Sequence, residues 1–366
     1  MLRLKDLLNS GISELSPYEP GKPIEDLERE LGLSDIVKIA SNENPLGPSP
    51  FAVSKIKEYL NDLHRYPDGN AYNLKRALSR KFSISKDRIT IGNGSNDIIE
   101  FISRCFLSSS DSAIFSEYAF AVYPLVVQGL GAEGIEVPSL DWSHDLERIL
   151  SSIKPNTKLI FIANPNNPTG TFIPKDDVLN FAKQVPENVL VLLDQAYFDY
   201  SSYEEEDVDF NDIESIPNLL ISRTFSKAYG LAGLRVGFSY SSSEMSDYLN
   251  RIRQPFNTNT LALVAAEEAL KDKEHLKRSL EVNKLEKEKL YQEFDELGFE
   301  YIPSHANFIS FDCKDYADTA FETFLKEGII VRSMRVYKMP RHLRVTIGTS
   351  EENRKFINAL KKIHNG

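Results

Sequence analysis

The sequence predicts an α/β protein with a large domain built on a mainly parallel sheet covered by helices, followed by a smaller α+β domain. Two observations carry this prediction. Up to about residue 260, short and nearly continuous apolar runs alternate with helical patterns, as expected for strands covered on both faces. Beyond that point a long charged segment with helical spacing replaces the alternation.

The strand candidates of the first part are apolar runs that follow one another at intervals suited to intervening helices. They are residues 88–92, 112–117, 158–165, 189–197, 219–225 and 235–241. Between the first two, Ile98, Ile102, Cys105 and Phe106 fall at i, i+4, i+7 and i+8, which is one face of a helix. The alternation therefore predicts helices packed on a sheet.

The second part begins with charged residues 271–298, which predict one long helix or two abutting ones. Gly298 is a suitable C-terminal stop, and Leu290, Phe294 and Leu297 would form the inner stripe near that end. Strand candidates at 308–313, 328–334 and 343–348 then surround a helical segment at 317–328.

These patterns divide the chain into three segments. Residues 1–36, rich in proline, form an N-terminal segment that we expect to pack on the small domain or on a partner subunit. Residues 37–262 form the large domain, and residues 263–366 the small one.

Composition narrows the function classes. The 366 residues carry 43 basic and 54 acidic side chains, a net charge of −11, so no basic field is available for nucleic acid. No apolar run reaches the ~18 residues of a membrane span, and the N-terminus lacks the pattern of a signal peptide. Two cysteines suit a reducing compartment, so we expect a cytoplasmic protein. The acidic stretch 203–212 predicts a solvated segment rather than a metal site.

In open α/β sheets ligands bind beyond the carboxyl ends of the strands, so the residues that follow each strand candidate are the candidate site. After residues 88–92, Gly92 and Gly94 allow a tight turn, and Ser95 and Asn96 stand at the start of a helix. Free amides and the helix dipole favour a phosphate there. A plain strand–helix turn capped by Ser95 or Asn96 is the alternative.

Two further strand ends carry polar side chains. In "ANPNNPTG" (163–170) two prolines make a rigid turn, which either presents the Asn167 amide to an oxyanion or is a structural loop. Asp194 ends the apolar run 189–197, where it either meets a cationic partner or caps the next turn.

Lys227, in "SRTFSKAYGLAGLRVGF" (222–238), follows the next strand, with Thr224 and Ser226 beside it. An ordinary surface lysine is the simple interpretation. A lysine that forms a Schiff base with a cofactor aldehyde instead explains its place near phosphate-binding groups, and Arg235 supplies a fixed cation for the same phosphate. A phosphate cradle, an amide, a buried carboxylate and a reactive lysine together suit pyridoxal phosphate.

At these residues the sequence resembles the fold-type I pyridoxal-phosphate aminotransferases. "NPNNPTG", "DQAY" and "SRTFSKAYGLAGLRVG" carry the match. Within that superfamily the chain is most similar to the histidinol-phosphate aminotransferases, through "LSPYEPGKP", "IASNENPLGPSP", "HRYPDG", "GNGSNDIIE" and "LRVTIGT". The resemblance spans nearly the whole chain and implies a seven-stranded central sheet.

The resemblance implies a role for each matching position. The catalytic residues would be Lys227, which carries the cofactor and shuttles a proton, Asp194, which pairs with the pyridine nitrogen, and Tyr197, which bonds the ring oxygen. The other cofactor ligands would be Ser95, Asn96, Phe120 stacked on the ring, Asn167, Thr224, Ser226, Arg235 and, from a partner subunit, Tyr66. The substrate-binding residues would be Tyr18, Asn42, Arg332 and Arg344.

The resemblance also implies a reaction and an assembly. The amino group would pass between L-histidinol phosphate, or imidazole-acetol phosphate, and glutamate, or 2-oxoglutarate, in a homodimer with shared sites. An aromatic aminotransferase or a threonine-phosphate decarboxylase shares the same machinery and is the alternative. A non-catalytic domain of a transcription regulator would need a DNA-binding module, and the sequence shows no basic winged-helix segment.

Overall fold

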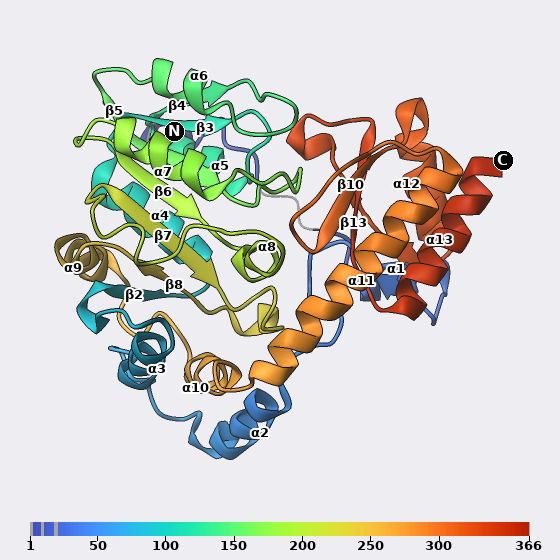
Figure 1. Cartoon of the computed structure of the whole chain (residues 1–366), viewed down its shortest axis with the longest axis horizontal. Helices are drawn as coiled ribbons and strands as arrows, with labels where there is room; N and C mark the ends of the chain where they lie inside the picture. The colour runs from blue at the N-terminus through green and yellow to red at the C-terminus, as the bar shows by residue number, and fades with distance from the viewer. Residues whose placement is uncertain (1–2, 9–10, 18–20, 366) are drawn as a thin grey trace.

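The computed structural model describes residues 3–8, 11–17 and 21–365. A seven-stranded sheet forms the centre of the large domain, on the left of Figure 1, in the order β2-β8-β7-β6-β5-β3-β4. The strands are β2 (Ile89–Gly92), β3 (Ser112–Ser116), β4 (Glu133–Val137), β5 (Thr157–Ala163), β6 (Leu190–Asp194), β7 (Leu219–Thr224) and β8 (Gly237–Tyr240). Only β8 runs antiparallel to its neighbours, so the predicted mainly parallel seven-stranded sheet is confirmed.

Six of the seven strands overlap the predicted apolar runs, and β4 is the one that sequence reasoning missed. It lies at the edge of the sheet, where it pairs with β3 alone. Only Val137 of its five residues is buried, and two of the others are glutamates. An edge strand with one solvated face lacks the continuous apolar run that marks the central strands.

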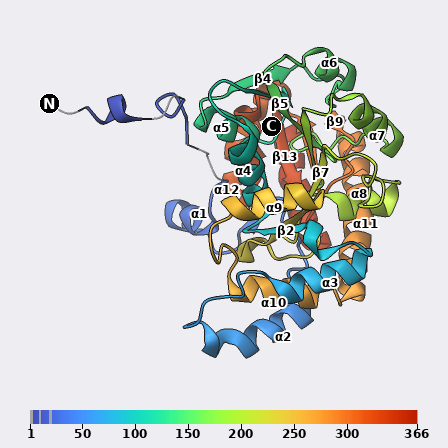
Figure 2. The ribbon, with the colours of Figure 1, turned by 90° about the vertical axis from the view of Figure 1, so that its left-hand side faces the viewer.

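Helices cover both faces of this sheet (Figures 1 and 2). One face packs on α3 (Tyr72–Phe82), α7 (Lys175–Gln184) and α10 (Thr260–Ala269), with α2 (Pro50–Tyr59) on the outer side of α10; the other packs on α4 (Ser95–Phe106), α5 (Val122–Gly129) and α9 (Ser243–Ile252). Within β5, Ile160 and Ile162 belong to the first core, and Leu159 and Phe161 to the second. Because both of its faces are buried, β5 carries apolar side chains on both sides of the sheet, which explains its continuous apolar run.

The small domain, on the right of Figure 1, begins with α11 (Lys273–Leu297), which is one helix rather than two. Gly298 ends it in the left-handed conformation, with φ of +69°, as predicted. An antiparallel sheet follows in the order β12 (Arg332–Ser333), β13 (His342–Thr346), β10 (Phe308–Asp312) and β9 (Tyr301–Ile302). The helices α12 (Ala317–Lys326) and α13 (Ser350–Asn365) cover it, and Leu290 and Phe294 of α11 enter the same core.

The N-terminal part of the chain packs on the small domain from α1 (Ile24–Leu31) onwards. Leu27 contacts Ala40 and Ile330, and β1 (Val37–Lys38) pairs in parallel with β11 (Ile329–Ile330). Before it, the short helix η1 (Leu4–Leu7) stands away from the rest of the molecule in Figure 2. The domain boundaries after residues 36 and 262 stay a prediction.

Within the described ranges, no helix is both long and apolar enough to cross a membrane. In the same ranges no group of three or more His, Cys, Asp and Glu side chains could hold a metal ion.

Candidate active site

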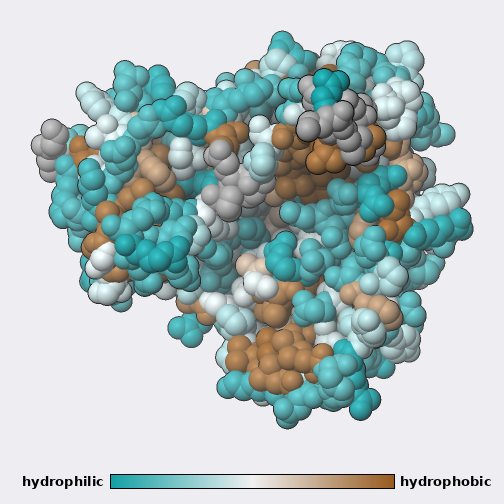
Figure 3. All heavy atoms as spheres, turned by 180° about the vertical axis from the view of Figure 1, so that it is seen from behind, coloured by the Kyte–Doolittle hydropathy of each residue, from teal (hydrophilic) through white to brown (hydrophobic). Residues whose placement is uncertain are grey.

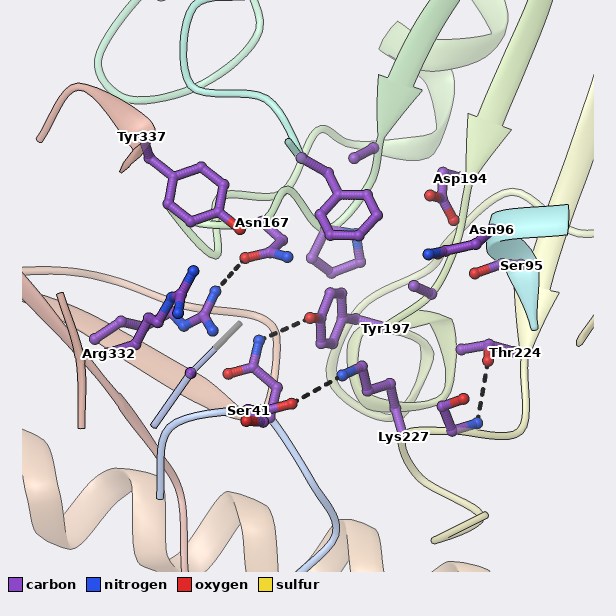
Figure 4. Close-up of a pocket in the computed structure, with 18 of the residues that line it drawn as sticks. Ser41, Ser95, Asn96, Asn167, Asp194, Tyr197, Thr224, Lys227, Arg332 and Tyr337 are labelled. Atoms are coloured by element: carbon purple, nitrogen blue, oxygen red, sulfur yellow. Dashed lines mark hydrogen bonds between the residues drawn. The ribbon is translucent and has the colours of Figure 1, made fainter. Parts of the chain in front are cut away.

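A cavity lies between the carboxyl ends of the parallel strands and the sheet of the small domain (Figure 4). It brings together most of the residues that the sequence singled out: Asn42, Ser95, Asn96, Phe120, Asn167, Asp194, Tyr197, Thr224, Ser226, Lys227, Arg235, Arg332 and Arg344. Tyr66 does not line it; its side chain lies on the surface and stacks on Phe256 with ring centroids 4.8 Å apart. Tyr18 lies outside the described residues.

The sheet topology explains why residues so distant in sequence meet. β2, β5, β6 and β7 end at the same edge, so the polar residues that follow them share one cavity. The antiparallel β8 begins at that edge, and Arg235 stands two residues before it. Lys227, which follows β7, and Arg235, which precedes β8, therefore lie at the same edge of the sheet.

Lys227 presents an amine that is readily unprotonated near neutral pH. Its Nζ donates a hydrogen bond to the Ser41 carbonyl at 3.1 Å. Burial, together with the positive charges of Arg344 and Arg235, lowers the pKa of Lys227 from 10.5 to about 7. An amine with such a pKa can act as a nucleophile or as a proton carrier without strong base.

Asp194 ends β6 as a buried carboxylate held by two hydroxyl groups. Ser222 Oγ donates to Oδ1 at 3.0 Å, and Tyr123 Oη donates to Oδ2 at 2.8 Å. Burial raises the pKa of Asp194, while the two hydrogen bonds oppose that rise. A carboxylate in this setting favours a cationic group of a ligand as its partner.

An anion cradle forms where β2 turns into α4. Gly94 has φ of +83°, and a Cβ atom on it would lie 2.5 Å from Nη2 of Arg235. A Cβ atom on Gly237 would lie 2.6 Å from the backbone nitrogen of Ser95. Because Gly94 and Gly237 have no side chains, the guanidinium group of Arg235 and the N-terminus of α4 can lie close enough to bind the same anion.

Hydroxyl groups complete this cradle. Arg235 Nη1 donates to Ser226 Oγ at 3.3 Å, and the backbone N–H of Ser226 donates to Thr224 Oγ1 at 3.1 Å. With Ser95 and Asn96 at the first turn of α4, the cradle offers amides, hydroxyls and a fixed cation. This donor set suits a phosphate group.

Asn167 and Tyr197 both line the cavity and are drawn near each other in Figure 4. Asn167 lies in a turn with cis peptide bonds before Pro165 and Pro168. Its Oδ1 accepts a hydrogen bond from Arg344 Nη1, which leaves its Nδ2 as a donor toward the cavity. Both side chains can therefore donate to an oxygen atom of a ligand ring.

The small domain contributes two guanidinium groups. Arg332 and Arg344 are register partners on β12 and β13, so both project from the same face of the sheet. Arg344 Nη2 donates to the Ala40 carbonyl at 3.1 Å, and its Nε is buried without a hydrogen-bond partner among the described atoms. With Arg235, the described lining has three guanidinium groups, besides the amine of Lys227, and one carboxylate, so it favours anionic ligands.

Sequence reasoning missed several residues of the cavity. They include Gly21, Ala40, Ser41, Tyr123 and Tyr337; Ser222, which is not part of the lining but bonds Asp194, was missed as well. Tyr123 follows Phe120 by three residues, at the start of α5, and this helical spacing is a signal that could have found it. Ala40 and Ser41 act through backbone carbonyls, for which the sequence carries no side-chain signal.

The model of the family "Aminotransferase class I and II" matches residues 34–360 of the chain. The chain belongs to this aminotransferase family. Curated relatives agree with this family. The chain is 50% identical to "Histidinol-phosphate aminotransferase 2" of Pseudomonas fluorescens, over 98% of this chain and 97% of the relative. It is 48% identical to "Histidinol-phosphate aminotransferase 1" of Nitrosococcus oceani, covering 98% and 96%. The assignment of this aminotransferase to the histidinol-phosphate aminotransferase subfamily is thereby confirmed.

Solved structures confirm the fold of this aminotransferase. The histidinol-phosphate aminotransferase of Sinorhizobium meliloti, determined in complex with pyridoxal 5'-phosphate, superposes with a TM-score of 0.90 at 29% identity over 97% of this chain and 96% of that one. The aspartate aminotransferase of Thermus thermophilus shares the fold, with a TM-score of 0.83 at 20% identity over 96% and 98%.

The side chains of the cavity fit pyridoxal phosphate. The anion cradle of α4 suits its phosphate, the buried carboxylate of Asp194 suits its pyridinium nitrogen, and the amine of Lys227 suits its aldehyde. The predictions of an aminotransferase and of this cofactor are therefore confirmed. The roles of single residues stay predictions, and the next subsections develop them as proposals.

Proposed function

We propose that this chain transfers an amino group between L-histidinol phosphate, or imidazole-acetol phosphate, and glutamate, or 2-oxoglutarate. The observation that carries the proposal is the full-length identity of 48–50% to histidinol-phosphate aminotransferases, and the cavity supports it with an anion cradle, a buried carboxylate and an amine of lowered pKa. Pyridoxal phosphate, when bound, supplies an aldehyde that carries the amino group and a ring that accepts electrons from the substrate carbon.

The side chains of the large domain hold and orient the reacting groups. Asp194 would keep a ring nitrogen protonated, because a positive charge beside it offsets the cost of burying the carboxylate. Lys227, with a pKa of about 7, takes a proton at Nζ and returns it without a large energetic cost in either direction. Asn167 and Tyr197 donate hydrogen bonds toward the ring oxygen.

The small domain binds the part of the substrate that does not react. Glutamate carries two carboxylates, whereas histidinol phosphate carries a phosphate and an imidazole ring. Arg332 and Arg344 can accept either anion, because a guanidinium group bonds carboxylate and phosphate in the same bidentate geometry. We propose that Arg344 clamps the carboxylate of glutamate and that Arg332 meets the phosphate.

The test compares kcat/KM for histidinol phosphate, phenylalanine and threonine phosphate as amino donors, with 2-oxoglutarate as acceptor. We expect histidinol phosphate to exceed phenylalanine by at least about a hundredfold, because the phosphate adds a charge-assisted contact. Equal values for phenylalanine would favour an aromatic aminotransferase. Release of CO₂ from threonine phosphate would favour the decarboxylase.

We further propose a homodimer in which Tyr66 reaches the cofactor phosphate of the partner. Tyr66 is 83% exposed, and Phe51, Leu60 and Leu63, which precede it in the chain, are also exposed. Figure 3 shows an apolar patch toward the bottom of the rear face, the end of the molecule at which α2 lies. An exposed patch of this kind is typical of a subunit interface.

Mixed dimers test the shared site. Lys227→Ala and Tyr66→Ala chains, each weakly active alone, should regain about a quarter of the wild-type activity when they are mixed, unfolded and refolded together, since half of the dimers would contain one intact site of two. No recovery in mixed dimers of confirmed composition would show that Tyr66 does not act across an interface.

We propose the cytoplasm as the location of the enzyme. The support is chemical: Cys313 is buried, Cys105 is partly buried, and neither forms a disulfide. Fractionation of the source cells with an antibody to this chain tests the proposal, and recovery from a membrane or secreted fraction would contradict it.

A further inference from the structure

Asn42 stands between the two domains in a backbone conformation that few residues adopt. Its φ is +56°, in the left-handed region that asparagine tolerates better than most residues, and only 1% of it is exposed. The two residues before it contact the active site through their carbonyls: Ala40 accepts from Arg344, and Ser41 accepts from Lys227. Asn42 continues this segment, but it acts through its side chain.

Hydrogen bonds from the small domain fix which end of the Asn42 amide is the donor. The backbone N–H of Asn42 donates to Thr346 Oγ1 at 2.9 Å, so the hydroxyl proton of Thr346 remains available to donate. Thr346 Oγ1 lies 3.3 Å from Asn42 Oδ1, which accepts that proton. Asn307 Nδ2 donates to the Asn42 carbonyl at 3.1 Å and holds the backbone. The amide nitrogen of Asn42 is therefore turned to the other side, toward the large domain.

The amide nitrogen meets Tyr197. Asn42 Nδ2 donates to Tyr197 Oη at 2.7 Å, so this bond uses the lone pair of the phenol and leaves its proton free to point into the cavity (Figure 4). Burial raises the pKa of Tyr197, whereas the bond from Asn42 opposes that rise and makes the phenol a stronger donor. Lys227 Nζ lies 5.7 Å from the centre of the same ring.

We propose that Asn42 is a positioning residue that aims the Tyr197 hydroxyl at the ring oxygen of the cofactor, and that Thr346 and Asn307 hold Asn42 in place from the small domain. This assignment differs from the substrate contact expected for Asn42 from sequence. It depends on pyridoxal phosphate in the cavity, but not on the identity of the amino donor.

The substitution Asn42→Gly is the sharpest test, because glycine adopts the left-handed conformation without strain and only the amide is lost. The readout is the pH titration of the cofactor's absorption band in the holoenzyme without substrate. A weaker hydrogen bond from Tyr197 destabilises negative charge on the ring oxygen, so we expect the midpoint to rise by about half a pH unit or more. We expect kcat to fall by about tenfold, with a smaller change in KM.

Two comparisons separate positioning from a general structural role. Tyr197→Phe should move the midpoint in the same direction, and the double variant with Asn42→Gly should show no further change in midpoint or kcat, because both changes remove one interaction. Thr346→Val should give a smaller rise, and Thr346→Ser, which keeps the hydroxyl, should restore the wild-type midpoint. If Asn42→Gly does not fold, the difference in midpoint between Thr346→Val and Thr346→Ser tests the proposal instead.

An unchanged midpoint in a folded Asn42→Gly holoenzyme, or additive effects in the double variant, would overturn the proposal. A low activity with histidinol phosphate alongside the expected shift would leave the positioning role intact and count only against the proposed substrate.

Discussion

The basicity of Lys227 is set by its surroundings and has a consequence for stability. Its pKa is about 7 in the folded chain and 10.5 in an exposed lysine, so the folded state binds fewer protons than the unfolded state between these values. Protonation of Lys227 therefore destabilises the cofactor-free protein fully below about pH 7, and this penalty fades as the pH rises toward 10.5.

We expect Lys227→Met to stabilise the cofactor-free protein at pH 6 by on the order of a few kcal/mol, with the gain vanishing near pH 10. Urea denaturation at both pH values measures it. Lys57→Met, at an exposed lysine of α2, is the control and should show no such pH-dependent gain. A gain for Lys227→Met that is equal at both pH values would contradict the lowered pKa.

Asp194 is the second residue whose environment decides its chemistry. Asp194→Asn keeps the shape of the side chain and one acceptor oxygen, but it removes the charge that would keep a ring nitrogen protonated. We expect kcat to fall by about a hundredfold or more, while the fold is retained. Tyr123→Phe, which removes one of the two hydrogen bonds to Asp194, should cost about tenfold or less. Circular dichroism and cofactor-loaded kinetics check both, and near-normal turnover of Asp194→Asn would refute the role of the carboxylate.

At the scale of the element, the turn from β2 into α4 is the most demanding piece of backbone. Gly94 adopts φ of +83°, and Arg235 fills the space where a side chain would begin. The helix N-terminus and the guanidinium group therefore share one anion only while residue 94 has no Cβ atom.

We expect Gly94→Ala to raise the dissociation constant for pyridoxal phosphate by about tenfold to a hundredfold, because the methyl group displaces Arg235 and the backbone is strained. Gly233→Ala is the matched control, since a Cβ atom there would meet nothing within 4 Å. Fluorescence titration of the cofactor-free protein gives both constants. Equal affinities in the two variants would mean that the cradle tolerates the displacement.

Sequence reasoning predicted the strands that have a strong local apolar pattern. It missed or merged strands whose existence depends on the segment with which they pair. The central strands have continuous apolar runs because both faces are buried, whereas edge strand β4 has two exposed glutamates. The run 328–334 divides into β11 and β12, because Ile329 and Ile330 pair with β1 and Arg332 pairs with Arg344. Which sheet a short strand joins depends on distant segments, and one sequence does not contain that information.

At the scale of the whole molecule, most site residues could be predicted because the sequence gives the order of the strands and a parallel sheet places their carboxyl ends at one edge. Asp194 ends β6 and Lys227 follows the neighbouring parallel strand β7 by three residues, so both lie at the same edge of the sheet. The contacts of Ala40, Ser41 and Asn42 depend instead on a segment that runs between the domains. Backbone carbonyls and the direction of an amide appear only once both domains are in place.

The two guanidinium groups of the small domain lead to a prediction about substrates. We expect Arg332→Met to lower kcat/KM for glutamate and for histidinol phosphate by about tenfold to a hundredfold, and to change it far less for phenylalanine, whose side chain carries no anion. Parallel kinetics with the three donors test this expectation. An equal loss for all three would place Arg332 outside the binding of the distal anion.

Arg332 and Arg344 lie opposite each other on neighbouring strands of a small antiparallel sheet, which fixes the positions from which both side chains start. Their Cα atoms are held about 5 Å apart by the ladder, whatever the side chains do. Because both side chains start from one rung, both guanidinium groups can reach the same anionic group, whose oxygen atoms can bond both cations. A phosphate, with about two negative charges, can in this way neutralise both arginines, whereas a single carboxylate leaves one positive charge in excess.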